Sequence, residues 1–120
     1  MVEQMNDLPE GVVGVSATGE VTHEDYQNVI IPAVEQALAQ KDKIRFLYHL
    51  GPDFSGFKAG AMWDDAKLGL AHTRAWERVA VVTDVEWIRK AMRAFGVLIP
   101  GELKVFPNSE LAAAREWIVA

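Results

Sequence analysis

The chain contains no cysteine among its 120 residues, which excludes disulfide bonds, thiolate catalysis and thiolate metal sites. It also has no run that approaches the roughly 18 consecutive apolar residues of a membrane-spanning helix. The first eleven residues are acidic and lack the basic start and apolar run of a signal peptide. We therefore expect a cytoplasmic protein, with peripheral contact to a membrane as a further expectation.

Positive charge is absent from the first third of the chain. Residues 1–40 hold seven acidic residues and no lysine or arginine, and the net charge of the whole chain is −5. Because phosphate contacts dominate the affinity for nucleic acids, this balance argues against a nucleic-acid-binding protein. Residues 87–100 show the reverse, with three basic residues and no acidic one. An ordinary solvated surface is the simplest interpretation of both stretches.

The length and composition are those of one globular domain, since half of the residues are hydrophobic and 24% are charged. No repeat, low-complexity tract or linker divides residues 1–120. Short apolar runs alternate with amphipathic stretches, which is typical of βα units in a mostly parallel sheet. The runs predict strands at 11–18, 44–50, 78–83 and 103–106, with a hairpin partner for the first strand at 2–6. The sequence thus predicts an α/β fold with four to five strands and about four helices.

Local signals mark the ends and bends of the helices. The segments 22–25 and 83–86 each place a threonine three residues before an acid, which predicts a capping box at both helix starts. Pro32 lies inside the first helical pattern and predicts a kink, because it lacks an N–H and crowds the preceding turn. Gly96 predicts a left-handed residue that ends the third helix.

Three longer stretches resemble one known family. They are Gly-Pro-Asp-Phe-Ser-Gly-Phe at 51–57, Val-Ala-Val-Val-Thr-Asp-Val-Glu-Trp-Ile-Arg-Lys at 79–90, and Ile-Pro-Gly-Glu-Leu-Lys-Val-Phe at 99–106. With shorter matches at 24–26 and 31–33, they are similar to bacterial SpoIIAA-like, STAS-related proteins. The resemblance covers nearly the whole chain. It implies a STAS-like fold, related in shape to CRAL-TRIO lipid-exchange domains, and a non-catalytic regulator that binds a protein, an apolar ligand or a membrane.

The motif Asp53-Phe54-Ser55-Gly56 resembles the Asp-x-Ser-Gly motif of anti-sigma-factor antagonists, in which a partner kinase phosphorylates the serine at a helix start. Free N–H groups and the helix dipole stabilise a phosphate at such a position. The turn-rich segment 51–57 predicts a loop that leads into a helix, as this motif requires. A plain helix cap is the alternative interpretation of Ser55. Phosphorylation of Ser55 is the basis of our alternative function, a protein–protein switch.

Large apolar residues also gather around this predicted loop. At the C-terminal end of a strand they lie where α/β sheets bind ligands. We expect them to line a pocket for an apolar or amphipathic molecule: Phe54, Phe57, Met62 and Trp63. The helical spacing also places Met62 and Trp63 on the predicted buried face of the following helix, so core packing is the alternative for Trp63.

The segment 87–100 combines basic and apolar residues. A helix places the basic side chains on one face, and a loop with three large aliphatic residues follows: Arg89, Lys90 and Arg93, then Val97, Leu98 and Ile99. An apolar loop beside basic residues can contact an anionic bilayer or gate an apolar pocket. Packing under the sheet edge, or a homodimer contact, is the alternative.

Signatures of catalysis and metal binding are missing. The three histidines, His23, His49 and His72, lack the i, i+4 spacing of a helical metal site, so we predict no metal and no cofactor. Neither a Gly-x-Ser-x-Gly elbow nor a Gly-x-x-x-x-Gly-Lys loop is present. The sequence therefore favours a non-catalytic binding or regulatory module.

Overall fold

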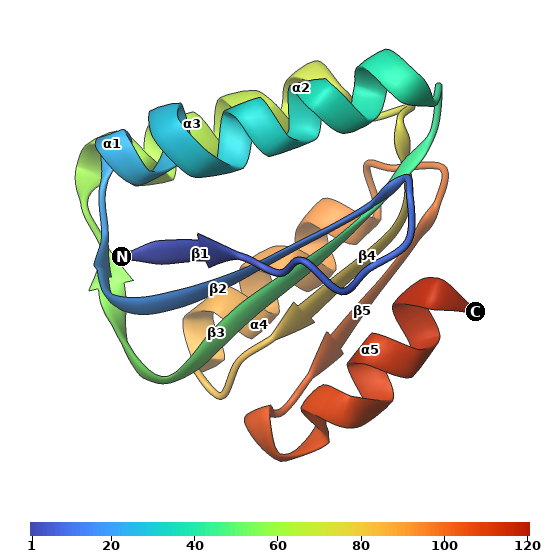
Figure 1. Cartoon of the computed structure of the whole chain (residues 1–120). Helices are drawn as coiled ribbons and strands as arrows, with labels where there is room; N and C mark the ends of the chain where they lie inside the picture. Colours follow the sequence, from blue (N-terminus) through green and yellow to red (C-terminus); the bar gives the residue numbers. More distant parts are fainter.

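The computed structural model describes residues 1–120, in which helices cover both faces of a five-stranded sheet (Figure 1). The strands lie across the sheet in the order of the sequence: β1 (Val2–Gln4), β2 (Val12–Val21), β3 (Ile44–Phe57), β4 (Trp76–Val82) and β5 (Glu102–Phe106). β1 pairs antiparallel with β2, and all other neighbours are parallel. The predicted α/β class and the N-terminal hairpin are confirmed.

The helical segments follow the strands in a simple arrangement. They are α1 (His23–Asp25), the π-helical η1 (Tyr26–Ile30), α2 (Ile31–Gln40), α3 (Ala59–Ala71), α4 (Glu86–Gly96), the 3-10 segment η2 (Asn108–Glu110) and α5 (Leu111–Val119). Right-handed crossovers between successive parallel strands place the connecting helices on one face of the sheet. Only α5, which follows the last strand, covers the other face (Figure 1).

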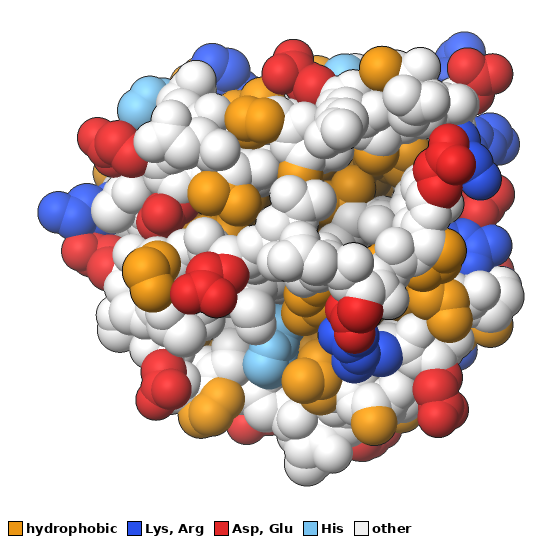
Figure 2. Space-filling model, in the orientation of Figure 1, with side chains coloured by type: hydrophobic (Ala, Val, Ile, Leu, Met, Phe, Trp, Pro, Cys, Tyr) orange, Lys and Arg blue, Asp and Glu red, His pale blue; other side chains and the backbone are white.

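The face of the molecule that carries β1 and α5 is polar. Figure 2 shows acidic and basic side chains mixed over it, with hydrophobic side chains in small separate groups. None of the helices has the length and apolar character that would be needed to cross a bilayer.

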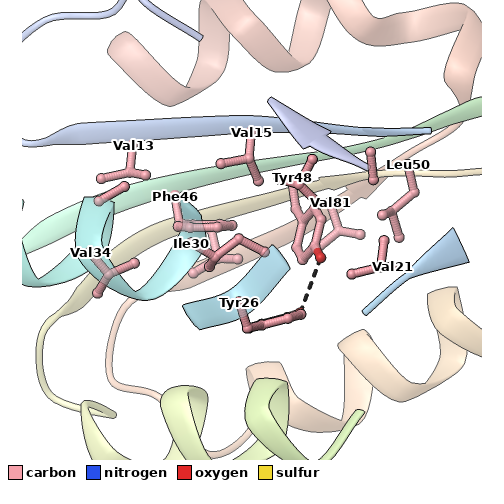
Figure 3. Packing of buried hydrophobic residues seen from close by; sticks show 14 of the residues in the cluster. Val13, Val15, Val21, Tyr26, Ile30, Val34, Phe46, Tyr48, Leu50 and Val81 are labelled. Carbon is pink, nitrogen blue, oxygen red and sulfur yellow. Dashed lines mark hydrogen bonds between the residues drawn. The ribbon is translucent and has the colours of Figure 1, made fainter. Parts of the chain in front are cut away.

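The core is divided by the sheet, because side chains of a strand alternate between its two faces. Phe46, Tyr48 and Leu50 of β3 belong to a cluster of 19 buried residues under α2, α3 and α4 (Figure 3). Leu47 points the other way, into a cluster of five buried residues beneath α5. Each fully buried aliphatic side chain stabilises the fold by about 1.5–3 kcal/mol, so the larger cluster dominates stability.

The first helix begins as its sequence predicts, and its hydrogen-bonding pattern changes next to Pro32. The backbone N–H of Thr22 donates to Asp25 Oδ2 at 2.9 Å, and the N–H of Asp25 donates to Thr22 Oγ1 at 3.3 Å, so this capping box is confirmed. Pro32 lies in the first turn of α2, directly after the π-helical segment η1. A proline ring crowds the carbonyl four residues before it, and here that carbonyl belongs to Asn28 in the widened turn.

The predicted loop at 51–57 is wrong, because β3 continues to Phe57. Residues 51–53 form a bulge between the pairs Ala17–Leu50 and Gly19–Phe54. Pro52, which has no N–H to donate, therefore needs no partner on β2. Pairing with β2 then resumes up to Val21 and Phe57. The continued pairing of backbone groups thus outweighs the turn chemistry of glycine, proline and aspartate in this segment.

Two predicted details around α4 are also wrong. The hydroxyl of Thr83 accepts a hydrogen bond from the Val85 N–H at 3.1 Å, and α4 starts at Glu86 without a capping box. Gly96 does not adopt a positive φ but forms the last residue of α4. A Cβ at Gly96 would lie 3.2 Å from the Leu103 Cβ, so its small size serves close packing against β5.

Candidate functional site

An apolar cavity of about 360 Å³ lies between α3 and α4, above β3 and β4. Fourteen of the sixteen residues that line it are hydrophobic. The sheet supplies aromatic and aliphatic side chains to its floor, and α3 and α4 supply its walls. The floor residues are Phe46, Tyr48, Trp76, Val79 and Val81.

The cavity exists because small residues face each other where the two helices meet. Ala66 and Gly69 of α3 and Ala91 and Ala94 of α4 all line it. α3 packs mainly against α1 and η1, and therefore does not close onto α4. The ring of Phe95 packs closely on the backbone of Gly69 across the cavity, since a Cβ at Gly69 would lie 3.2 Å from that ring. Short side chains on separated helices thus leave a space that the core does not fill.

A smaller cavity of about 120 Å³ adjoins the first. Its own lining includes Leu50, Phe57, Met62, Trp87 and Ile88, while five residues line both cavities: Tyr48, Asp65, Val81, Ala91 and Met92. The two cavities therefore meet along a shared wall of α3, α4 and the sheet.

A short chain of polar groups lies inside this apolar region. The Tyr26 hydroxyl donates to Asp65 Oδ1 at 2.6 Å, and the hydroxyl oxygens of Tyr26 and Tyr48 are 3.1 Å apart. Figure 3 shows the two tyrosines pointing toward each other from η1 and β3. Because the only hydroxyl hydrogen of Tyr26 goes to Asp65, Tyr48 must donate to Tyr26. The chain therefore runs from Tyr48 through Tyr26 to the carboxylate.

Burial controls the ionisation of these three groups. It raises the pKa of the Asp65 carboxyl, although the hydrogen bond from Tyr26 acts in the opposite direction. It also raises the pKa of Tyr26 and of Tyr48, and the nearby charge of Asp65 adds to both shifts. Both hydroxyls therefore keep their protons at any physiological pH and serve as donors.

Exposed apolar side chains concentrate around these cavities. Eight large hydrophobic residues are substantially exposed, and six of them lie on α3, on α4 or just after α4: Met62, Trp63, Leu70, Trp87, Val97 and Leu98. Of these, Leu70 and Leu98 line the larger cavity, and Met62 and Trp87 line the smaller one. The apolar lining thus continues onto the surface.

The four residues predicted to bind a ligand are only partly brought together. Phe57 and Met62 line the smaller cavity, and Phe54 stands behind Phe57 with ring centroids 5.0 Å apart. Trp63 lines neither cavity and is 67% exposed. The predicted burial of Met62 and Trp63 is wrong, because α3 packs against α1 and η1 and turns Ala61 and Asp64 inward.

The acid pair in α3 is the feature that sequence reasoning missed. Asp64 contacts Nδ1 of His23, and Asp65 accepts from Tyr26, so both acids connect α3 to the first helical segment. The available signal was two adjacent acids in a helix whose only other charged residue is Lys67. Their partners lie 41 and 39 positions away, which no local pattern reveals.

The residues predicted to meet a membrane have different environments. Arg89 donates to the Thr83 carbonyl oxygen at 2.9 Å and so supports the start of α4. Lys90 and Arg93 are exposed. Val97 and Leu98 are exposed as well, whereas Ile99 is 6% exposed and belongs to the core.

Ser55 is exposed, but it lies in β3 and not at a helix start. α3 begins at Ala59 with Lys58 as its N-cap, so the argument from free helical N–H groups is wrong for Ser55. Phosphorylation at Ser55 stays a prediction.

Other polar clusters do not form a recognisable centre. The Ser16 hydroxyl and His49 Nδ1 are 2.8 Å apart, with no carboxylate on the ring, and burial lowers the pKa of His49. No group of three or more histidine, aspartate or glutamate side chains is placed to hold a metal ion.

Comparison with known proteins identifies the family. A sequence model described as SpoIIAA-like matches residues 12–119. The chain belongs to the SpoIIAA-like family. The crystal structure of an uncharacterized protein from the DUF3478 family with a SpoIIAA-like fold, from Shewanella loihica PV-4, is 32% identical to it. That comparison covers 98% of this chain and 92% of the other, with a TM-score of 0.75.

Among curated proteins, no relative matches this chain. The predicted resemblance and fold are confirmed, and the SpoIIAA-like fold is generally that of a regulatory module without catalysis. The family does not name a ligand, which must be inferred from the cavity itself.

Proposed function

We propose that this SpoIIAA-like domain is a non-catalytic binding module whose cavity between α3 and α4 takes an apolar or amphipathic small molecule. The observation that carries this proposal is the cavity of about 360 Å³ with fourteen hydrophobic residues among sixteen. Ligand sites are typically apolar clefts with a few polar groups. Here the hydroxyl group of Tyr48 and the carboxyl group of Asp65 are the polar groups in the lining.

The dimensions suit a small ligand. Sites for small molecules span roughly 300–1,000 Å³, so this cavity falls at the lower end. It has room for about a dozen heavy atoms if each occupies the ~30 Å³ that one water takes in the liquid. Each buried methylene contributes about 0.8 kcal/mol, so micromolar affinity needs a hydrocarbon body of about ten methylenes, which nearly fills this space.

The exposed apolar side chains support the same function. Leu70 and Leu98 lie at the edge of the larger cavity and stay substantially exposed. Exposed apolar side chains that cluster at one place on a protein surface often mark a binding site, whereas single scattered ones do not. A ligand in the cavity would cover part of this apolar area.

Filling the cavity from α4 tests the proposal. Ala91 is exposed yet lines both cavities, so Ala91→Trp places a large side chain in the shared space. Ala113→Trp is the matched control, because Ala113 is an exposed alanine of α5 on the other face of the sheet. A fluorescent apolar probe should bind the wild type and Ala113→Trp and lose at least tenfold affinity for Ala91→Trp. Equal binding to both variants would refute the cavity as the site.

A membrane surface is the second candidate, favoured by exposed Trp87 of α4 and Val97 just after it, which share this segment with exposed Lys90 and Arg93. Trp63 on α3 is exposed as well. Basic residues near a surface contribute about 1 kcal/mol each toward anionic lipids. Lys90→Glu with Arg93→Glu should therefore weaken binding to phosphatidylserine vesicles by an order of magnitude or more. Arg89 is left intact because it supports α4. If the double variant binds these vesicles as well as the wild type does, or if the wild type does not bind them, a membrane surface is excluded as the ligand.

A further inference from the structure

One carboxyl side chain lines the cavity in an otherwise mostly apolar wall. Asp65 of α3 is the only aspartate or glutamate among the residues that line either cavity, and it lines both. It therefore stands where the two spaces meet, beside the aromatic floor. A polar group at such a junction can reach a ligand that occupies either space.

The carboxylate of Asp65 is only half satisfied by the protein. Oδ1 accepts the hydrogen bond from the Tyr26 hydroxyl at 2.6 Å, and this is the only side-chain hydrogen bond that Asp65 makes. Oδ2 has no partner in the protein, and it is not among the fully enclosed unpaired atoms. Because Asp65 lines both cavities, we take Oδ2 as the oxygen that a ligand there can reach.

No basic group balances this carboxylate. The five ion pairs of the structure involve other acids, including Asp25, Asp64 and Glu77. An unpaired acid in an apolar setting costs stability, and burial raises its pKa accordingly. Asp65 combines this perturbed pKa with a place where the two cavities meet, which are the two features of a functional-site candidate.

The surroundings of Asp65 favour a cation. A carboxylate forms its strongest hydrogen bonds with charged donors. The rings of Phe46, Tyr48 and Trp76 line the same cavity, and the faces of aromatic rings attract cations. A fatty carboxylate, in contrast, offers no hydrogen-bond donor to Asp65 and would be repelled by its ionised form.

We propose that the ligand is an amphipathic amine, whose apolar body fills the cavity and whose ammonium or amine group donates to Asp65 Oδ2. This inference rests on the proposed function and names the chemical class of its ligand. It assigns Asp65 as the residue that determines specificity, with Tyr26 holding the carboxylate in place.

Three probes of equal chain length separate the head group from the chain. We would titrate dodecylamine, dodecanol and dodecanoate, each below its aggregation limit, and follow the fluorescence of Trp76 and Trp87, which line the two cavities. The amine should bind the wild type at least tenfold more tightly than the alcohol, since hydrogen bonds to charged groups exceed neutral ones. Dodecanoate should bind most weakly.

Asp65→Asn then tests the residue. The amide keeps an acceptor for Tyr26 and removes the charge, so the fold should persist, which circular dichroism verifies. Affinity for dodecylamine should fall about tenfold while affinity for dodecanol stays unchanged. Glu116→Gln, an exposed α5 position, removes the same charge far from the cavity and should change neither.

Each outcome decides between the two proposals. An amine preference that Asp65→Asn abolishes and Glu116→Gln retains supports the assignment. Equal binding of amine and alcohol by the wild type, or a preference that survives Asp65→Asn, overturns it while leaving cavity binding intact. If none of the three probes binds, the proposed function fails and the inference fails with it.

Discussion

Removing a single hydroxyl group tests the polar chain beneath the cavity. In Tyr26→Phe, Asp65 loses its only side-chain hydrogen bond, of 2.6 Å, and Tyr48 loses its acceptor at 3.1 Å. Hydrogen bonds to charged groups contribute about 1.5–3 kcal/mol, and a buried polar group that is left without a partner adds the cost of its desolvation. We therefore expect the free energy of unfolding to fall by about 2–3 kcal/mol, measured by urea denaturation with tryptophan fluorescence.

Tyr48→Phe is the matched control, since its hydroxyl reaches Tyr26 but makes no bond to Asp65. It should cost only about 0.5–1.5 kcal/mol, the usual range for a neutral hydrogen bond. In the Asp65→Asn background, Tyr26→Phe should cost less than in the wild type, which gives a coupling energy of about 1 kcal/mol. A change in the free energy of unfolding of less than about 0.5 kcal/mol in Tyr26→Phe would contradict this prediction, because additive mutations scatter by about that amount. A smaller loss in Tyr26→Phe than in Tyr48→Phe would contradict it as well.

Two further predictions concern stability. Because burial raises the pKa of Asp65, the folded state binds this proton more readily than the unfolded chain, so its stability falls as pH rises from the ordinary aspartate pKa toward the raised one. The stability of Asp65→Asn relative to wild type should therefore grow from acid to neutral pH, and parallel denaturation curves at every pH would contradict this. Gly101→Ala should destabilise by more than about 3 kcal/mol, because a Cβ there would lie 2.2 Å from the Trp76 carbonyl oxygen. Gly60→Ala, inside α3 with only the His23 Cβ at 3.3 Å, should leave the melting temperature unchanged or raise it, and similar losses in both variants would refute the packing argument.

Much of the fold could be predicted because its signals are local. Apolar runs predict the strands, and the recurrence of Tyr26, Ile30 and Val34 at every fourth position predicts one face of the first helical stretch, which is buried. The segment 51–57 could not be predicted in this way. Its turn residues favour a loop, and only pairing with β2, far away in the sequence, keeps it extended.

The site depended on relations that no local pattern carries. The cavity results from the separation of α3 and α4, and its signals were small residues such as Ala66 and Ala91, which are common in any helix. The inward face of α3 is set by contacts of Asp64 and Asp65 with the first helix, so the apolar spacing of Met62 and Trp63 predicted the wrong face.

Native mass spectrometry of the protein purified from its own host would show whether the cavity holds a ligand, when the same sample is measured again under denaturing conditions. We expect a mass excess that disappears on denaturation, that is retained by Ala113→Trp and that is missing from Ala91→Trp. A positively ionising amphipathic amine in the released fraction would identify the ligand class. A wild type that always carries only its own mass, or an excess that Ala91→Trp retains, would contradict a ligand in the cavity between α3 and α4.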